Sequence, residues 1–318
     1  PILGVLRSDA SLHATDALRG TMDVQNPFAL KAHLAVVRPA EANAMAAPSL
    51  SGDLARLHVD AHARSGTASA TASAILRPDE PQPLDALDVV IRDLDPRALD
   101  AGLPHAQIEA EIALARKGER LEGPVSVRNA VAGPVDQERV PLASLQAQLL
   151  GDRSAFVFSQ LHADLGAAGV VTGSGNVEGE EATLDLVVQA LNLHAIHSVL
   201  REPRLKGDAK LKLGPSAQSV VAELSQDDIR LAFAADRSGD DIEIRRFDAR
   251  TSGGSAEGRA HINVSGRMPF NAQVQLNQFD PSAWGEFPQG SINASLRAEG
   301  VAQEPAGKVE VALRDSRW

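Results

Sequence analysis

The sequence contains no cysteine and no tyrosine, and only 3% of its 318 residues are aromatic. The absence of cysteine excludes disulfide bridges, thiolate catalysis and cysteine-based metal sites. No segment approaches the roughly 20 apolar residues that a membrane-spanning helix needs, and none has the charged start and apolar stretch of a secretion signal. Lysine and arginine form no block, and a net charge of -11 argues against nucleic acid as a partner, because binding phosphates requires clustered positive charge.

What the chain does contain is typical of a folded protein. Hydrophobic residues make up 43% and charged residues 23% of the sequence, which is too apolar for general disorder. The chain begins with Pro1 rather than methionine and ends at Trp318 just after a strand pattern. We therefore expect it to be part of a longer protein whose membrane anchor lies outside residues 1–318.

One pattern recurs three times along the chain. The third copy contains Phe279-Asp280-Pro281 and the first contains Leu94-Asp95-Pro96, each preceded by one strand pattern and followed by another. The middle copy keeps the strand patterns around Leu191 but has Asn192-Leu193 in place of Asp-Pro. The aligned positions lie 97 and 88 residues apart, which predicts a repeat of roughly 90 to 100 residues. The approximate repeat cores are residues 66–116, 170–213 and 254–300.

Apolar residues alternate with polar ones in segment after segment. Such a period of two is typical of strands with one dry and one wet face, and it predicts an antiparallel, half-buried sheet. Glycine-containing turns between the segments favour hairpins and a long meander. The apolar members predicted to line the dry face are Ile108, Ile112, Leu114, Leu184, Leu186, Val188, Leu211, Leu213, Val274, Leu276, Ile292, Leu296, Val309, Val311 and Leu313.

Two stretches have a helical pattern, and both fall at the same place in the repeat. Leu193, Ile196 and Val199 recur at helical spacing, and Pro96 can open a short turn because proline fixes its own φ angle. The Asp-Pro element is therefore predicted to be a short helical turn between runs of sheet.

The histidines provide the first candidate chemistry. His194 and His197 have a spacing that could place two imidazoles on one helical face, as in many zinc sites, but no third ligand is evident. His58 and His62 lie in alternating sequence, where four residues separate the side chains by about 13 Å, too far for one metal ion. We expect no metal site and no cofactor.

Paired carboxylates and a glycine run are the other candidates. Asp227-Asp228, Asp240-Asp241 and Glu180-Glu181 lie in turn-like polar sequence, which favours solvated turns over acid–base catalysis. The run from Gly173 through Gly175 to Gly179 resembles a dinucleotide-binding loop only superficially, because a strand rather than a helix follows it. We predict that the chain is not an enzyme.

The repeat resembles that of the AsmA-like family, and in particular the TamB-type translocation and assembly modules of Gram-negative envelopes. The resemblance rests on Phe279-Asp280-Pro281, on Gly290-Ser-Ile292-Asn-Ala294-Ser-Leu296 with Gly300, and on Leu94-Asp95-Pro96 with the segment 108–112. These motifs are short, but their order and spacing span about two-thirds of the chain.

The resemblance implies one elongated antiparallel sheet, curled lengthwise into an open groove of the β-taco type, with short helical turns between repeats. It implies a periplasmic location, an N-terminal tether to the inner membrane, and passage of phospholipid acyl chains along the groove toward the outer membrane. It also implies an outer-membrane barrel partner of the TamA type.

Three functional hypotheses follow. The first is a non-enzymatic lipid conduit, because the alternation is one-sided and no active site is evident. The second is a chaperone-like scaffold that offers a sheet edge to outer-membrane proteins. The third is a series of immunoglobulin-like adhesin domains, which also run to about 100 residues but usually carry a buried tryptophan and a tyrosine corner.

Overall fold

The structure is a computed structural model, and it describes residues 17–22, 30–37, 45–46, 49–53, 55–98, 102–152, 154–266, 268–301 and 307–317, with the backbone alone before residue 49. Its strands are β1 (Ala17–Met22), β2 (Leu30–Val37), β3 (Met45–Ala46), β4 (Ser49–Gly52), β5 (Leu57–Ser65), β6 (Ala68–Leu76), β7 (Leu84–Leu94), β8 (Ile108–Lys117), β9 (Arg120–Asn129), β10 (Ser144–Gly151), β11 (Ala155–Asp164), β12 (Val170–Glu178), β13 (Glu181–Leu191), β14 (Leu205–Leu213), β15 (Ala217–Gln226), β16 (Ile229–Ser238), β17 (Asp241–Thr251), β18 (Gly254–Asn263), β19 (Pro269–Phe279), β20 (Ser291–Val301) and β21 (Gly307–Arg317).

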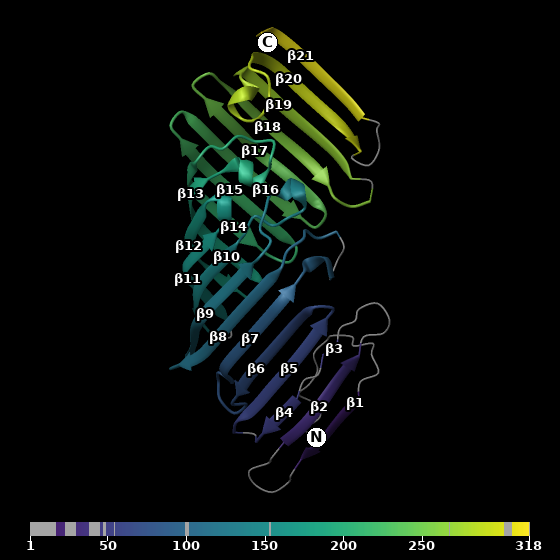
Figure 1. Cartoon of the computed structure of the whole chain (residues 1–318), viewed down its shortest axis with the longest axis vertical. Coiled ribbons are helices and arrows are strands. Elements are labelled where there is room, and N and C mark those ends of the chain that lie inside the picture. Colours follow the sequence, from purple (N-terminus) through teal and green to yellow (C-terminus); the bar gives the residue numbers. More distant parts are fainter. Residues whose placement is uncertain are drawn as a thin grey trace.

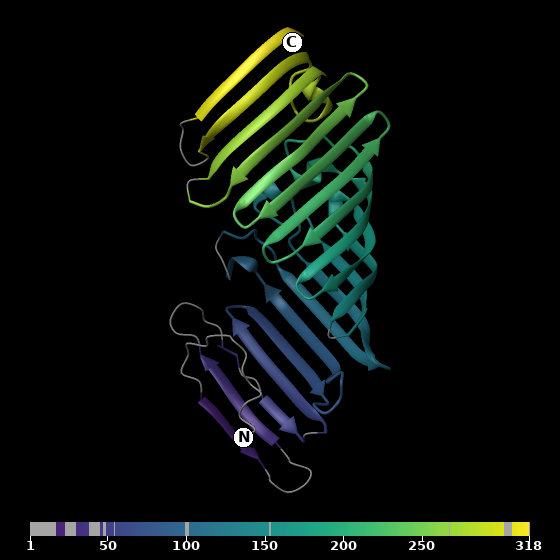
Figure 2. The ribbon, with the colours of Figure 1, turned by 180° about the vertical axis from the view of Figure 1, so that it is seen from behind.

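All these strands belong to one antiparallel sheet, so the predicted all-β class and meander are confirmed. β3 and β4 lie between β2 and β5, and from β5 onward each strand pairs with the next one in the sequence. The strands are inclined to the long axis and follow one another along it, with β1 and β21 at opposite ends (Figures 1 and 2). Among the described residues β1 does not pair with β21, so the sheet is not a closed barrel.

The predicted helical turns are present. The two Asp-Pro elements open the 3-10 turns η1 (Pro96–Ala98) and η4 (Pro281–Ala283), and the middle copy forms α1 (Leu193–Ile196). Two further turns, η2 (Val135–Gln137) and η3 (Gly166–Ala168), follow β9 and β11. Each turn follows an odd-numbered strand, so all five lie at the same edge of the sheet.

The three repeat cores fall on β6–β8, β12–β14 and β18–β20, a spacing of six strands. In each core the register between the second and third strands shifts at a β-bulge near the end of the second strand. The bulge residue has a positive φ angle, between 45° and 53°, although none of the three is glycine. These residues, Asp93, Ala190 and Gln278, immediately precede the aligned positions Leu94, Leu191 and Phe279.

The middle copy keeps the cap of the turn although it lacks the Asp-Pro pair. The Asn192 side chain accepts a hydrogen bond from the His194 backbone N–H at 2.9 Å. The Asp280 carboxylate accepts the equivalent bond from Ser282 at 3.0 Å. Since asparagine and aspartate cap helical turns equally well, the substitution preserves the local structure.

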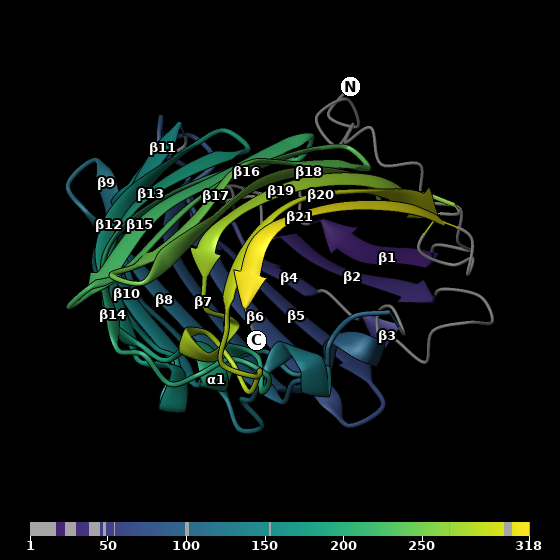
Figure 3. The ribbon, with the colours of Figure 1, turned by 90° about the horizontal axis from the view of Figure 1, so that it is seen from above.

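Loops at this edge contact one another across several strands. We call this edge the loop rim, comprising residues 102–107, 130–143, 192–204 and 280–290. The Arg201 backbone N–H donates to the Trp284 carbonyl at 2.9 Å, although β13 and β19 are six strands apart. Six strand spacings correspond to about 29 Å on a flat sheet, so the two loops extend along the rim toward each other. Figure 3 shows the long strands curved and α1 with its neighbouring turns gathered on one side.

The single sheet also excludes one of the three functional hypotheses. An immunoglobulin-like domain packs two sheets face to face with Greek-key connections, whereas here consecutive strands pair in order along one sheet. The interpretation as a series of immunoglobulin-like domains is therefore wrong.

Candidate functional site

Apolar residues lie directly opposite one another along almost the whole sheet. A first row runs from β5 to β21, and every one of its seventeen members is apolar or glycine. Opposed side chains in an antiparallel pair have Cβ atoms about 5 Å apart, so the row is a continuous strip. Its members are Ala63, Ala70, Ile91, Ala110, Val127, Leu145, Ala163, Val171, Val188, Gly207, Leu224, Leu231, Ala249, Ala256, Leu276, Ala294 and Leu313.

Two parallel rows lie beside the first and are equally free of polar residues. The second is Ala61, Ala72, Val89, Ile112, Val125, Ala147, Leu161, Gly173, Leu186, Ala209, Ala222, Phe233, Phe247, Gly258, Val274, Leu296 and Val311, with one interruption at the bulge of β11. The third is Val59, Ala74, Leu87, Leu114, Gly123, Leu149, Phe158, Gly175, Leu184, Leu211, Val220, Ala235, Ile244, Ala260, Ala272, Ala298 and Val309, with one step between β8 and β9 that is not a register pair. We call the side of the sheet that carries the three rows the apolar face.

The opposite side, the polar face, has a different character. One of its rows runs through His62, Thr71, Val90, Glu111, Ser126, Gln146, His162, Thr172, Val187, Asp208, Glu223, Ala232, Asp248, Glu257, Gln275 and Ser295. Since neighbouring residues of a strand point to opposite faces, this row interleaves with the apolar ones. The sheet thus separates a dry side from a wet side over its length.

All fifteen residues predicted to line the dry side lie on the apolar face. Their exposure differs along the sheet: Leu114, Val188 and Ile292 are buried, at 6 to 8% exposed. Leu213 is 40% exposed, and the three residues of β21, Val309, Val311 and Leu313, are 51 to 65% exposed. Exposure of the large side chains therefore varies along the face, and it is highest on β21.

Burial in the middle of the face comes from side chains of neighbouring strands. Leu205 is fully buried and Leu224 is 7% exposed, and both belong to a cluster with Val188 against which Leu193 of α1 packs. A second cluster joins Leu114, Leu121 and Leu149, and a third joins Ala147, Leu161 and Ala163. No second sheet covers these clusters in the described chain.

The small members of the rows were not among the residues predicted to line the dry face, which were all large. Gly173 and Gly175 belong to the glycine run that resembles a dinucleotide-binding loop only superficially. On β12 they make room for the leucines of β13. A Cβ on Gly173 would lie 2.9 Å from Leu186 Cδ2, and one on Gly175 would overlap Leu184. Their role is therefore packing on the apolar face, and the cross-strand register reveals it.

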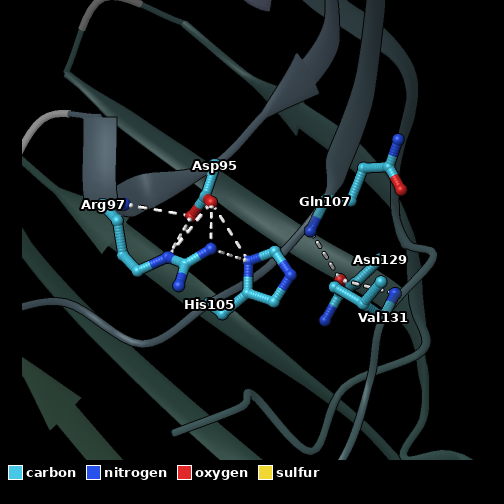
Figure 4. Close-up of polar contacts among 6 residues, drawn as sticks. All are labelled: Asp95, Arg97, His105, Gln107, Asn129 and Val131. Carbon is cyan, nitrogen blue, oxygen red and sulfur yellow. Dashed lines mark hydrogen bonds and ion pairs between the residues drawn. The ribbon is translucent and has the colours of Figure 1, made fainter.

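The first turn of the loop rim carries a compact polar cluster that sequence reasoning did not identify. Asp95 accepts hydrogen bonds from Arg97, with Nη2 to Oδ2 at 2.7 Å, and its Oδ2 lies 3.0 Å from His105 Nδ1 (Figure 4). The Arg97 guanidinium, and less strongly His105, hold the pKa of the Asp95 carboxyl well below its usual value near 3.8. The capping aspartate of the Asp-Pro pair was the available signal for this cluster.

A neighbouring asparagine holds the loops that approach it. The buried Asn129 Oδ1 accepts the backbone N–H groups of Gln107 at 3.0 Å and Val131 at 3.2 Å (Figure 4). Both clusters bind loop backbone and charged neighbours at the rim, so these side chains hold the loops in position.

The histidines and paired carboxylates proposed from the sequence do not come together in one site. His194 Nδ1 lies 2.9 Å from the Leu200 carbonyl, and His58 and His62 lie along β5. No group of three or more potential metal ligands occurs within the described ranges. The Asp228 carboxylate accepts the Ser252 hydroxyl at 2.6 Å, which lowers its pKa and joins two hairpins.

A recess of about 610 Å³ lies on the polar face across β17 to β21. Arg246, Arg259 and Arg297 alternate there with Asp248, Glu257 and Glu310. Arg246 lies 3.5 Å from Asp248, and Arg259 donates to Gln273 at 2.8 Å. The apolar face remains the better candidate because its rows continue over many more strands than this recess.

No protein-family model, no curated protein and no solved structure matches the chain. The part of the chain that the structure describes has no helix with the length and hydropathy to cross a membrane.

Proposed function

We propose that this chain is a non-enzymatic segment of a periplasm-spanning protein of the TamB type, which carries phospholipid between the inner and outer membranes. In this proposal the sheet is curled lengthwise into an open groove with the apolar face inside. The observation that supports it best is the set of three rows of opposed apolar residues that run from β5 to β21.

The length and chemistry of the face suit acyl chains. Sixteen strand spacings extend over about 75 Å, several times the thickness of one bilayer leaflet. Burial of each methylene is worth about 0.8 kcal/mol, so an apolar strip needs no polar recognition to retain a lipid tail. A face that is apolar at every step lets a chain move along the sheet without a large barrier.

Burial and bending support the groove. Leu205 and Leu224 are almost inaccessible although the sheet has one layer, as expected on the inner side of a bend. Bulges at Asp93, Ala190 and Gln278 recur at the loop rim, and bulges bend strands and increase their twist.

Photo-crosslinking in cells tests this proposal. A photoreactive amino acid placed at Leu276, on the apolar face, is expected to capture phospholipid. The same residue placed at Gln275, the next position of β19 and on the polar face, is the matched control. Equal capture at both positions, or protein adducts at Leu276 instead of lipid, would contradict the proposal.

A second candidate function, sheet-edge pairing with an outer-membrane protein, is favoured by β21. Within the described chain this strand pairs only with β20, and it exposes Val309, Val311 and Leu313. A strand edge beside exposed apolar side chains can add a further strand, from another protein or from a continuation of the same chain. A partner barrel of the TamA type would fit this edge.

A further inference from the structure

The two rims of the apolar face differ, because loops that are bonded to one another run along the loop rim. Its long loops are joined in series by hydrogen bonds between segments distant in sequence. The His105 N–H donates to the Glu138 carbonyl at 2.7 Å, the Ser198 N–H to Asp136 at 3.0 Å, and the Arg201 N–H to the Trp284 carbonyl at 2.9 Å. These bonds link the loops that follow β7, β9, β13 and β19.

The loops also cover the apolar face at this rim. Leu193 packs against the cluster of Val188, Leu205 and Leu224. Leu142 and Leu165 pack against the cluster of Ala147, Leu161 and Ala163. Side chains from the loops therefore occupy the space above the ends of the rows.

Polar side chains of the sheet at the loop rim are used to hold these loops. Asn129 accepts the backbone N–H of Gln107, and Gln226 accepts that of Arg204. Both are uncharged. A polar group of a ligand would have to displace the loops to reach them.

The opposite edge, which we call the hairpin rim, comprises the short connections at residues 118–119, 179–180, 214–216 and 239–240. Here charged residues enter the apolar face. Arg237 on β16 lies directly opposite Gln218 on β15, in line with Leu213 and Ile242. Both polar side chains are exposed.

Arg237 keeps donor groups available. Its Nε donates to the Gly239 carbonyl at 3.0 Å, and it forms no ion pair with a carboxylate of the described chain. The turn of its hairpin contains the acidic residues Asp240 and Asp241. Asp241 lies 3.2 Å from His261 Nε2 and accepts a hydrogen bond from Asn263 Nδ2 at 2.9 Å. Arg116 of β8, another arginine at this rim in the described chain, is bound to Glu80 and to the Gln82 carbonyl.

The distance between the rims is greater than the length of one acyl chain. Leu205 and Leu213 mark the two ends of the apolar side of β14 and are eight residues apart, which corresponds to about 27 Å along a strand. The hydrocarbon depth of one bilayer leaflet is about 15 Å. A chain of that length fits between Arg237 and the covered loop rim and spans just over half of this distance.

From these observations we infer that a phospholipid lies parallel to the strands of this region, with its acyl termini toward the loop rim and its phosphodiester beside Arg237 and Gln218 at the hairpin rim. This inference rests on the proposed lipid transport and assigns an orientation to the lipid. A guanidinium presents several N–H donors that match phosphate oxygens, and glutamine adds an uncharged donor. The occupant is thus an amphiphile with an anionic phosphodiester.

Two photoreactive phospholipids test the orientation in cells that express the full-length protein. One carries a diazirine at the acyl terminus and the other carries it in the head group, and labelled peptides are mapped by mass spectrometry. The head-group probe is expected to label residues 213–218 and 237–242, and the acyl probe to label residues near Leu205, Leu224 and Leu231. Reversed labelling, or equal labelling of both rims by both probes, would overturn the inference while leaving lipid binding intact. Absence of labelling anywhere on the apolar face would instead reject the proposed function.

The variant Arg237→Gln isolates the charge at the hairpin rim. Loss of one charge-assisted hydrogen bond is expected to reduce head-group labelling there at least about fivefold, with acyl labelling unchanged. Arg230→Gln is the matched control, because Arg230 lies on the same strand but on the polar face. Head-group labelling that is unchanged in Arg237→Gln, or equally reduced in both variants, would refute the assignment of Arg237.

Discussion

Asp136 and Ser198, which lie 62 residues apart in the sequence, are joined by two hydrogen bonds. The Ser198 backbone N–H donates to Oδ1 at 3.0 Å and its hydroxyl donates to Oδ2 at 2.5 Å. The bonds connect the turn after β9 to the loop after α1, across four strands. They lower the pKa of the Asp136 carboxyl, mainly through the Ser198 hydroxyl.

The Asp136–Ser198 contact is predicted to hold the loop rim together. Asp136→Ala removes the acceptor of both bonds, so amide hydrogen exchange of residues 198–201 should accelerate, while that of β14 should change little. Asp185→Ala, which removes an exposed ion pair with Lys210, is the control and should not affect this loop. Unchanged exchange at 198–201 in Asp136→Ala would mean that the rim is held by other contacts.

Acid is predicted to loosen the first turn of the loop rim. The folded pKa of Asp95 is lowered, so the carboxylate stabilises the turn above its unfolded value near 3.8, and this contribution is lost as the pH falls through the folded pKa. Hydrogen exchange corrected for intrinsic rates should show residues 102–107 losing protection between about pH 4 and pH 2. Asp95→Asn should remove that pH dependence, and its persistence in this variant would assign it to another group.

Alanine substitutions at the buried and the exposed end of β14 are predicted to differ in their effect on the free energy of unfolding. Leu205→Ala creates a cavity at a fully buried site and should cost about 2 to 5 kcal/mol of unfolding free energy. Leu213→Ala on the same strand removes a side chain that is 40% exposed and should cost less than about 1 kcal/mol. Urea denaturation of the two variants measures the difference, and similar midpoints would contradict the burial of Leu205.

Charges on the apolar face are predicted to stop lipid capture. Leu276→Asp combined with Leu296→Asp places two carboxylates in neighbouring rows of β19 and β20, where an acyl chain would have to pass. Gln275→Asp with Ser295→Asp places the same charges on the polar face of the same strands. Phospholipid co-purifying with the full-length protein should fall in the first double variant only, and equal amounts in both would count against transport along this face.

A proline in β21 is predicted to separate the two candidate functions. Val311→Pro leaves the apolar rows of β5 to β20 intact but disturbs the strand edge, because proline lacks a backbone donor. If sheet-edge pairing matters, capture of an outer-membrane barrel partner should be lost while lipid crosslinking at Leu276 persists. Loss of both would indicate that the variant disturbs the sheet beyond β21.

Much of the architecture followed from local pattern. Alternation around Leu276 and Leu186 predicted strands and assigned their faces, because the period of a strand is two wherever the strand pairs. The Asp-Pro pairs predicted η1 and η4, since proline fixes the entry angle and aspartate caps the turn. What alternation missed were the small residues, such as Gly173, that complete the rows.

The sequence by itself determined the all-β class, the separation of a dry face from a wet one, and the repeat, because these depend on side-chain order along single strands. Only the tertiary structure decided that Leu224 lies opposite Leu231, that bulges form at Asp93 and Ala190, and that the loops join into one rim. Register, bulges and loop contacts depend on hydrogen bonds between segments that are distant in sequence, and no local pattern encodes those pairings.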